Sequence, residues 1–223
     1  MRWEILRRAH NKRLLLFFNG WGMDAHVVEH LTIAPDCDAL AVCDYRRVSI
    51  GFNVAALCDS YDDVTVIGWS MGVWAYAQVC AALAGVVKRV IAINGTAQPI
   101  HTEFGIDPGV YQATLDQFSA ETREKFFRRM CGSSAVFAQF QASLPQRPLP
   151  DQRRELRAIQ QTASTCSDES PRVDLALIGK QDRIIPAANQ ARYWQGRAGR
   201  VMMIDAPHYP FFLWKNWNDL LSY

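Results

Sequence analysis

Short runs of apolar residues recur along the chain, each followed by a turn and a helical pattern. The runs are continuous rather than alternating in polarity, as is typical of strands that helices cover on both faces. They occupy residues 14–18, 39–42, 64–68, 90–93, 173–178 and 201–204. Segments 71–83 and 187–195 between them have helical patterns and are expected to be crossover helices. The pattern predicts a doubly wound α/β fold with a mostly parallel central sheet.

Between residues 96 and 171 this alternation stops, and the chain carries helical patterns but no convincing strand. We expect a helical cap inserted between two core strands of a single domain spanning 1–223, with a break at 145–150. In the first cap helix an apolar face holds Phe126, Phe127 and Met130, and the opposite face holds Lys125, Arg128 and Arg129. In the second, Leu156, Ile159 and Ala163 line one side, and Arg153, Arg154 and Arg157 another.

Composition narrows the class of protein without choosing a function. With 223 residues and 49% apolar content the chain can bury one sizeable core. A net charge of +2 gives no general attraction to nucleic acid or a membrane surface. The six cysteines contain no CxxC pair, and the apolar run at 14–18 is too short for a signal peptide or a membrane span. We expect a cytosolic protein with reduced thiols, acting as a monomer.

The strongest chemical motif is Gly68-Trp69-Ser70-Met71-Gly72, which follows an apolar run and precedes a helical one. A G-x-S-x-G sequence between a strand and a helix is typical of a nucleophile elbow, in which a strained turn projects the serine from the sheet. The alternative is a tight strand-to-helix turn with an incidental serine. The motif predicts that Ser70 is a catalytic nucleophile.

Two later residues complete the expected catalytic set. Asp182 follows the run at 173–178, and His208 follows the run at 201–204, so both should reach the sheet edge that displays Ser70. The order Ser, Asp, His is that of α/β-hydrolases. Asp182 could instead be a solvated or helix-capping carboxylate, with Asp174 and Asp205 as weaker candidates, and His208 could be an ordinary loop histidine.

Acyl transfer also needs backbone amides that stabilise the developing oxyanion. Met71 follows the nucleophile and supplies one amide by position. The loop Asn19-Gly20-Trp21-Gly22 follows the first apolar run, and the Trp21 amide is the second candidate. This loop could also be a glycine-rich turn in which Trp21 only packs in the core. The chain has no G-x-G-x-x-G after its first strand, no P-loop and no H-E-x-x-H, so neither a cofactor nor a catalytic metal is expected.

Three segments resemble one particular family. They are Asn19-Gly20-Trp21-Gly22-Met23-Asp24, Asp44-Tyr45-Arg46 and Ile67-Gly68-Trp69-Ser70-Met71-Gly72-Val73-Trp74. The chain is similar there, and more loosely in the cap, to the pimeloyl-[acyl-carrier protein] methyl ester esterases of biotin synthesis in their short BioG form. The oxyanion loop begins with Asn19-Gly20 where most α/β-hydrolases have His-Gly, as in the BioG type.

The resemblance implies hydrolysis of a methyl ester at the end of a pimeloyl chain that acyl carrier protein holds. It implies an acyl pocket lined by Trp21, Phe126, Phe127 and Met130, and a docking surface for the acidic carrier. The docking candidates are Lys125, Arg128, Arg129, Arg153, Arg154 and Arg157. The aromatic face is also compatible with plain packing, and the basic face with solvation.

Two other functions remain open at this point. The chain could be a different acyl hydrolase of the same fold, such as a small-ester carboxylesterase or a thioesterase, because the three catalytic residues do not determine the leaving group. It could also be a non-catalytic α/β-hydrolase scaffold that serves as a binding module. Substrate profile separates the first alternative, and reaction with an organophosphonate separates the second.

Overall fold

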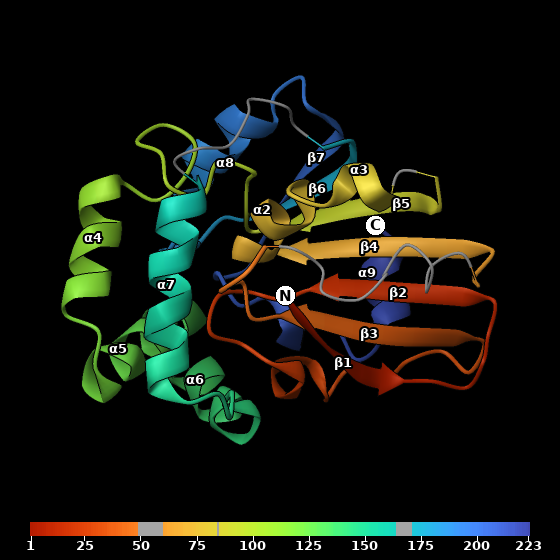
Figure 1. Cartoon of the computed structure of the whole chain (residues 1–223), viewed down its shortest axis with the longest axis horizontal. Helices are drawn as coiled ribbons and strands as arrows, with labels where there is room; N and C mark the ends of the chain where they lie inside the picture. The colour runs from red at the N-terminus through yellow and green to blue at the C-terminus, as the bar shows by residue number, and fades with distance from the viewer. Residues whose placement is uncertain (49–59, 84, 164–170) are drawn as a thin grey trace.

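The computed structural model describes residues 1–48, 60–83, 85–163 and 171–223. Within these residues seven strands form one sheet in the order β1-β3-β2-β4-β5-β6-β7 (Figure 1). The strands are β1 (Arg2–Arg7), β2 (Arg13–Phe18), β3 (Cys37–Cys43), β4 (Asp63–Trp69), β5 (Val87–Ile93), β6 (Val173–Gly179) and β7 (Ala198–Ile204). Strands β2 to β7 are parallel and β1 pairs antiparallel with β3. The prediction of a mostly parallel sheet is confirmed.

The two edges of the sheet differ from the sequence prediction. The apolar pattern does not predict β1, because this strand carries charged residues and none of its side chains is fully buried. Residues 201–204 were expected to be covered on both faces, which is wrong. They belong to the outermost strand β7, where Val201 is 39% exposed and Met203 is 44% exposed.

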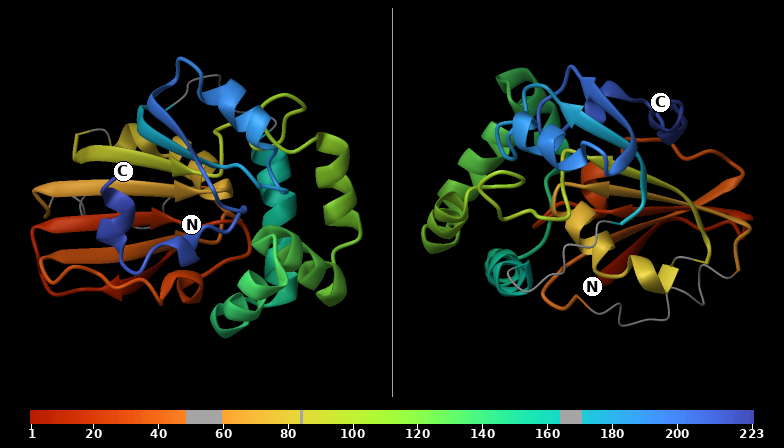
Figure 2. Two further views of the ribbon diagram at one scale, coloured as in Figure 1. Left: turned by 180° about the vertical axis from the view of Figure 1, so that it is seen from behind. Right: turned by 90° about the horizontal axis from the view of Figure 1, so that it is seen from above.

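Helices cover both faces of the sheet and create two cores (Figure 2). Against one face lie α2 (Met71–Ala77), α3 (Cys80–Leu83) and α8 (Ala187–Trp194), and against the other lie η1 (Ala25–Val28), η3 (Phe211–Leu213) and α9 (Trp217–Leu221). Strand residues alternate between the cores, so Leu16 and Phe18 lie in the core that contains α2, while Leu15 and Phe17 lie in the core that contains α9. Each such large side chain contributes about 1.5–3 kcal/mol on burial.

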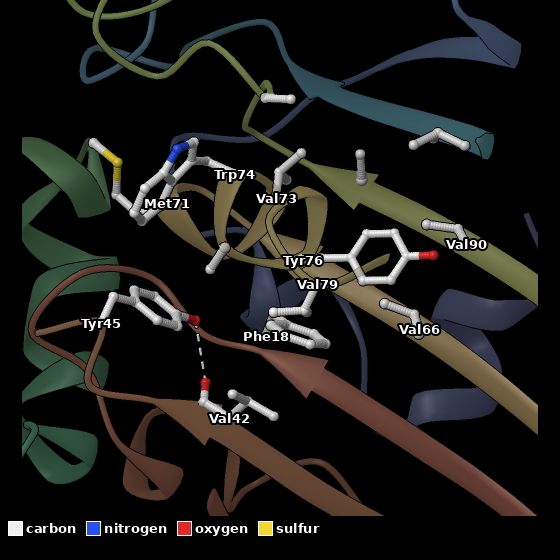
Figure 3. Packing of buried hydrophobic residues seen from close by; sticks show 14 of the residues in the cluster. Phe18, Val42, Tyr45, Val66, Met71, Val73, Trp74, Tyr76, Val79 and Val90 are labelled. Atoms are coloured by element: carbon white, nitrogen blue, oxygen red, sulfur yellow. Dashed lines mark hydrogen bonds between the residues drawn. The ribbon is translucent and has the colours of Figure 1, made fainter. Parts of the chain in front are cut away.

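Figure 3 shows how buried side chains pack in the first core, near the ends of the strands. Phe18, Tyr76 and Val79 gather on the face of the sheet that α2 covers, and Tyr45 points its hydroxyl at the carbonyl of Val42. The single helix expected at 71–83 is instead two short helices. The break lies at Gln78 and Val79, where the Val79 amide donates to Tyr76 O and closes a tighter turn.

The segment between β5 and β6 is helical, and it lies beyond the carboxyl ends of the parallel strands in Figures 1 and 2. It contains α4 (Pro108–Asp116), α5 (Ala120–Cys131), α6 (Ser134–Phe140), η2 (Gln141–Ser143) and α7 (Leu149–Ala163). We call these the cap helices. The expected cap, about 96–171, also includes 164–170, which lie outside the described residues. The break expected at 145–150 is shorter, because α7 begins at Leu149 and Pro150 occupies its first turn, where a missing N–H is tolerated.

Two further features bear on the sequence expectations. No helix in the described part of the chain is both long and apolar enough to span a membrane. Cys37, Cys43 and Cys131 are buried free thiols, while Cys58 and Cys166 lie outside the described residues.

Candidate active site

Ser70 occupies a strained turn between β4 and α2. Its backbone has φ 55° and ψ −123°, a conformation that costs of order 1–3 kcal/mol for a residue with a side chain. Two residues later, Gly72 allows a close backbone approach, since a Cβ there would lie 2.0 Å from the carbonyl oxygen of Phe18. The start of α2 therefore packs directly against the end of β2, which projects Ser70 at the carboxyl edge of the sheet.

The structure brings Ser70, His208 and Asp182 together in one line of hydrogen bonds. The Ser70 Oγ lies 2.9 Å from His208 Nε2, and His208 Nδ1 lies 2.7 Å from Asp182 Oδ2. All three residues are at most 8% exposed. With Nδ1 donating to the carboxylate, Nε2 is the ring nitrogen that can accept the serine proton.

The carboxylate of Asp182 is held on both oxygens. Oδ1 accepts the backbone amides of Ile184 at 2.8 Å and Ile185 at 3.0 Å, and Oδ2 accepts the side-chain amide of Gln190 at 2.8 Å. These donors fix the carboxylate while its second oxygen faces His208. Sequence reasoning missed Gln190, which lies eight residues downstream on α8 and carries no recognisable motif.

The loop that carries His208 is held by two residues that the sequence analysis also missed. The carbonyl of His208 accepts the Trp69 indole N–H at 2.9 Å and the Asn94 side-chain amide at 3.0 Å. Asn94, with φ 47°, also accepts the Gly179 amide at 2.6 Å. The residue that follows β5 thus ties the end of β6 to the histidine loop.

The two residues expected to supply oxyanion donors lie at the same pocket as Ser70. Trp21 and Met71 both line this pocket. Neither amide donates to an acceptor within the described residues, and the Met71 amide is at the start of α2, where helix geometry leaves donors unused. The arrangement is compatible with an oxyanion hole formed by Trp21 and Met71.

Asn19 gives the Trp21 loop its shape. Its side-chain Nδ2 donates to Asp24 O at 2.8 Å, and its Oδ1 accepts the Gly20 amide at 3.0 Å. Its own carbonyl accepts the Tyr45 hydroxyl at 2.7 Å. The side chain of Asn19 is therefore buried inside the loop that it closes, and it has a structural role.

A largely apolar pocket opens at Ser70. Of the four predicted pocket residues, Trp21, Phe126 and Met130 line it together with Tyr111 and Leu156. Burial raises the pKa of Tyr111 well above its ordinary value, so this phenol stays neutral.

Phe127 lies elsewhere. Its ring packs inside the cap, 5.4 Å from the ring of Phe140, and it is only 2% exposed. The expectation that Phe127 shares the pocket-facing surface with Phe126 is therefore wrong, because consecutive helical residues point about 100° apart.

The six basic candidates for carrier docking are all exposed, and they divide into two groups. Lys125, Arg128 and Arg154 are already paired with carboxylates of their own helices. Arg129, Arg153 and Arg157 have no ion pair within the part of the chain that the structure describes. Arg129 also lines the Ser70 pocket, so this exposed cation lies at the edge of the candidate active site.

Proteins with this sheet order and a serine at such a turn are α/β-hydrolases. The enol-lactonase from Burkholderia xenovorans LB400 superposes with a TM-score of 0.66 at 17% identity, covering 99% of this chain and 93% of the lactonase, so the two share the fold. The chain belongs to the pimeloyl-ACP methyl esterase BioG family, whose profile matches residues 4–220. The resemblance noted in the sequence motifs is confirmed at the level of the family.

Two relatives support this assignment. The crystal structure of BioG from Haemophilus influenzae has a TM-score of 0.89 and 30% identity, covering 99% of both chains. A Bacteroides fragilis (strain 638R) protein named malonyl-[acyl-carrier protein] O-methyltransferase is 39% identical over 198 residues. Those residues make up 89% of this chain, but this chain spans only 40% of that relative.

Proposed function

We propose that this chain hydrolyses the methyl ester of pimeloyl-[acyl-carrier protein], releasing methanol and the carrier-bound free acid in biotin synthesis. The observation that carries the proposal is the hydrogen-bonded line from Ser70 through His208 to Asp182, placed in the wall of an apolar pocket. The family match supports the substrate class.

The reaction begins with proton transfer from Ser70 Oγ to His208 Nε2 as the oxygen attacks the ester carbonyl. Asp182 stays ionised and stabilises the imidazolium that forms. The bond from the acyl carbon to the methoxy oxygen then breaks, and His208 returns the proton to the departing methanol. Water repeats the sequence on the acyl-enzyme, leaving a free carboxyl group and restoring Ser70.

The negative charge on the carbonyl oxygen is stabilised by the Trp21 and Met71 amides. Each such donor contributes roughly 100- to 1000-fold in rate when it is already oriented. Strain at Ser70 serves the same step, since the turn places both Ser70 and Met71, the first residue of α2, at the pocket.

The pocket suits a short apolar chain. Trp21, Phe126 and Met130 offer apolar contacts to the methylenes of a pimeloyl group, and Trp21 is braced by the rings of Phe118 and Phe126 at 5.4 and 5.1 Å. The unpaired cations are proposed as contacts for the acidic carrier, with Arg129 nearest the acyl group and Arg153 and Arg157 on α7.

Methanol release from methyl pimeloyl-carrier protein tests the proposal. We expect turnover that Ser70→Ala abolishes, and no methanol from pimeloyl-carrier protein that lacks the methyl group. Release of the carrier thiol from either substrate would identify a thioesterase instead. No turnover of either, with no labelling of Ser70 by an organophosphonate, would indicate a non-catalytic scaffold. We propose no methyl transfer, because the relative with that name extends far beyond the match to this chain.

A further inference from the structure

Glu155 is a fully buried carboxylate that joins the cap to the loop carrying Trp21. It lies on α7 and is 0% exposed. Its Oε2 accepts the backbone amide of Gly22 at 3.2 Å, and its Oε1 accepts the amide of Tyr45 at 2.8 Å. The Gly22 amide belongs to the peptide unit that follows the proposed oxyanion donor Trp21.

A buried arginine balances this charge. Arg147, whose side chain is 4% exposed, donates to Glu155 Oε2 at 2.6 Å and to the carbonyl of Met23 at 3.3 Å. Its second amino group lies 3.3 Å from Asp44, which also pairs with Arg46. Burial of Asp44 opposes ionisation, but these arginines keep its pKa below the ordinary value. The network therefore holds the loops after β2 and β3 against the start of α7.

Neighbouring contacts place α7 directly against Trp21. The Trp21 indole donates to the carbonyl of Gln152 at 2.9 Å. Gly22 has φ 74°, and a Cβ there would meet Gln152 Oε1 at 3.2 Å. The ring of Tyr45, whose amide Glu155 holds, lies 6.3 Å from the ring of Trp74 (Figure 3). Helix α7 thus contacts the Trp21 loop through the backbone carbonyl of Gln152 and the side chains of Gln152 and Glu155.

We propose that Glu155, balanced by Arg147, is a positioning residue that fixes the Trp21–Gly22 peptide, so that the Trp21 amide faces the reacting carbonyl only when α7 is docked. The inference rests on the proposed esterase function. A carboxylate is suited to this task because it accepts two backbone amides and the guanidinium at once. A glutamine in its place has one acceptor oxygen and two donors, so at least one of those partners loses its acceptor.

The test compares Glu155→Gln with the double variant Glu155→Gln/Arg147→Met, using methyl pimeloyl-carrier protein. The single variant removes the carboxylate closer to the buried Arg147 and leaves only Asp44 beside it, which lowers Tm. The double variant removes the arginine charge as well and restores much of Tm. We expect kcat, corrected for active sites titrated with an organophosphonate, to fall roughly 10- to 100-fold in both, with KM changing less than about threefold.

The matched control is Asp38→Asn, which alters another buried carboxylate. Asp38 is 0% exposed, and it accepts the Ala9 amide at 2.9 Å and the Tyr61 hydroxyl at 3.0 Å. It lies near the start of β3, at the edge of the sheet opposite to the one that carries Ser70. We expect a lower Tm and an unchanged kcat per titrated site.

The outcomes separate positioning from stability. Recovery of kcat together with Tm in the double variant, or an unchanged kcat in Glu155→Gln, would overturn the proposal. A trifluoromethyl ketone analogue should lose affinity for Glu155→Gln in step with kcat/KM if the oxyanion donor has moved. Failure of the wild-type protein to turn over the ester would refute the proposed function itself. The comparison of variants tests only the role of Glu155.

Discussion

The side-chain amide of Gln190 donates to the same carboxylate oxygen of Asp182 that faces His208. The two contacts are 2.8 Å from Gln190 Nε2 and 2.7 Å from His208 Nδ1. Gln190 is 0% exposed, and its Nε2 also donates to the carbonyl of Ile185. Asp182 and the loop after it are therefore fixed by one side chain from α8, so the orientation of the imidazole depends on a residue that cannot touch substrate.

Replacing Gln190 by leucine should lower kcat while leaving substrate binding nearly intact. The substitution preserves bulk but removes a hydrogen bond to an ionised carboxylate, an interaction of about 1.5–3 kcal/mol. We expect kcat to fall roughly 10-fold and KM to change less than twofold. Steady-state kinetics on the methyl ester measure both. Asn189→Leu is the control, because Asn189 donates to Thr102 O and Gly105 O rather than to Asp182. Equal losses in both variants would contradict a specific role of Gln190.

The adjacent phenylalanines of α5 should behave differently. Phe126→Ala enlarges the pocket, so we expect the preferred acyl chain to lengthen in a series of methyl esters of carrier-bound dicarboxylates. Phe127→Ala instead leaves a cavity inside the cap and should cost about 3–5 kcal/mol of stability with the chain-length profile unchanged. Thermal unfolding and competition between esters measure the two effects, and identical profiles for both variants would argue against Phe126 as a pocket wall.

The unpaired arginines should matter more than the paired cations. Changing Arg129, Arg153 and Arg157 together to glutamine should raise KM for the carrier-bound ester by about 10-fold and weaken its dependence on salt. KM for free dimethyl pimelate, which lacks a carrier, should change much less. The comparison variant replaces Lys125, Arg128 and Arg154, which partner cap carboxylates. A larger effect from that second triple variant would reverse the proposed docking surface.

Two buried thiols should resist alkylation well above neutral pH. Burial raises the pKa of both Cys43 and Cys131 to about 12. Since only the thiolate reacts, and at pH 8 roughly one molecule in 10⁴ carries it, native protein should be unmodified at both positions after treatment with iodoacetamide. Reactivity should appear only as the pH approaches 12 or the chain unfolds. Peptide mass spectrometry with a urea-unfolded control measures this, and modification of native protein at pH 8 would show the burial to be incomplete.

The sequence predicted what depends on local pattern. Continuous apolar runs located all six parallel strands to within a few residues, because a strand covered on both faces needs apolar side chains at successive positions. The two outer strands did not follow this relation between apolar residues and burial, since β1 is half-exposed and β7 is exposed at the edge of the sheet. Strand β1 has too few apolar residues to be recognised from the sequence, whereas β7 carries an apolar run although much of it is exposed.

The candidate site was predictable as far as its residues follow strands. Ser70, Asp182 and His208 each follow a parallel strand, so topology alone brings them to one edge. Asn94 also follows a strand, but nothing in its sequence context distinguishes it. Glu155 could not be foreseen, since it meets Tyr45 across 110 residues of chain and lies on a helix whose pattern resembles any amphipathic helix.

The contact between Ser70 and His208 joins residues 138 positions apart, with the whole cap encoded between them. At about 5–20 residues per second of translation, roughly 7–28 s pass between their incorporation on the ribosome. The serine is thus made long before the base that would activate it. Under the proposed mechanism, the emerging chain therefore carries a serine that has no base until β7 and the loop with His208 have been added.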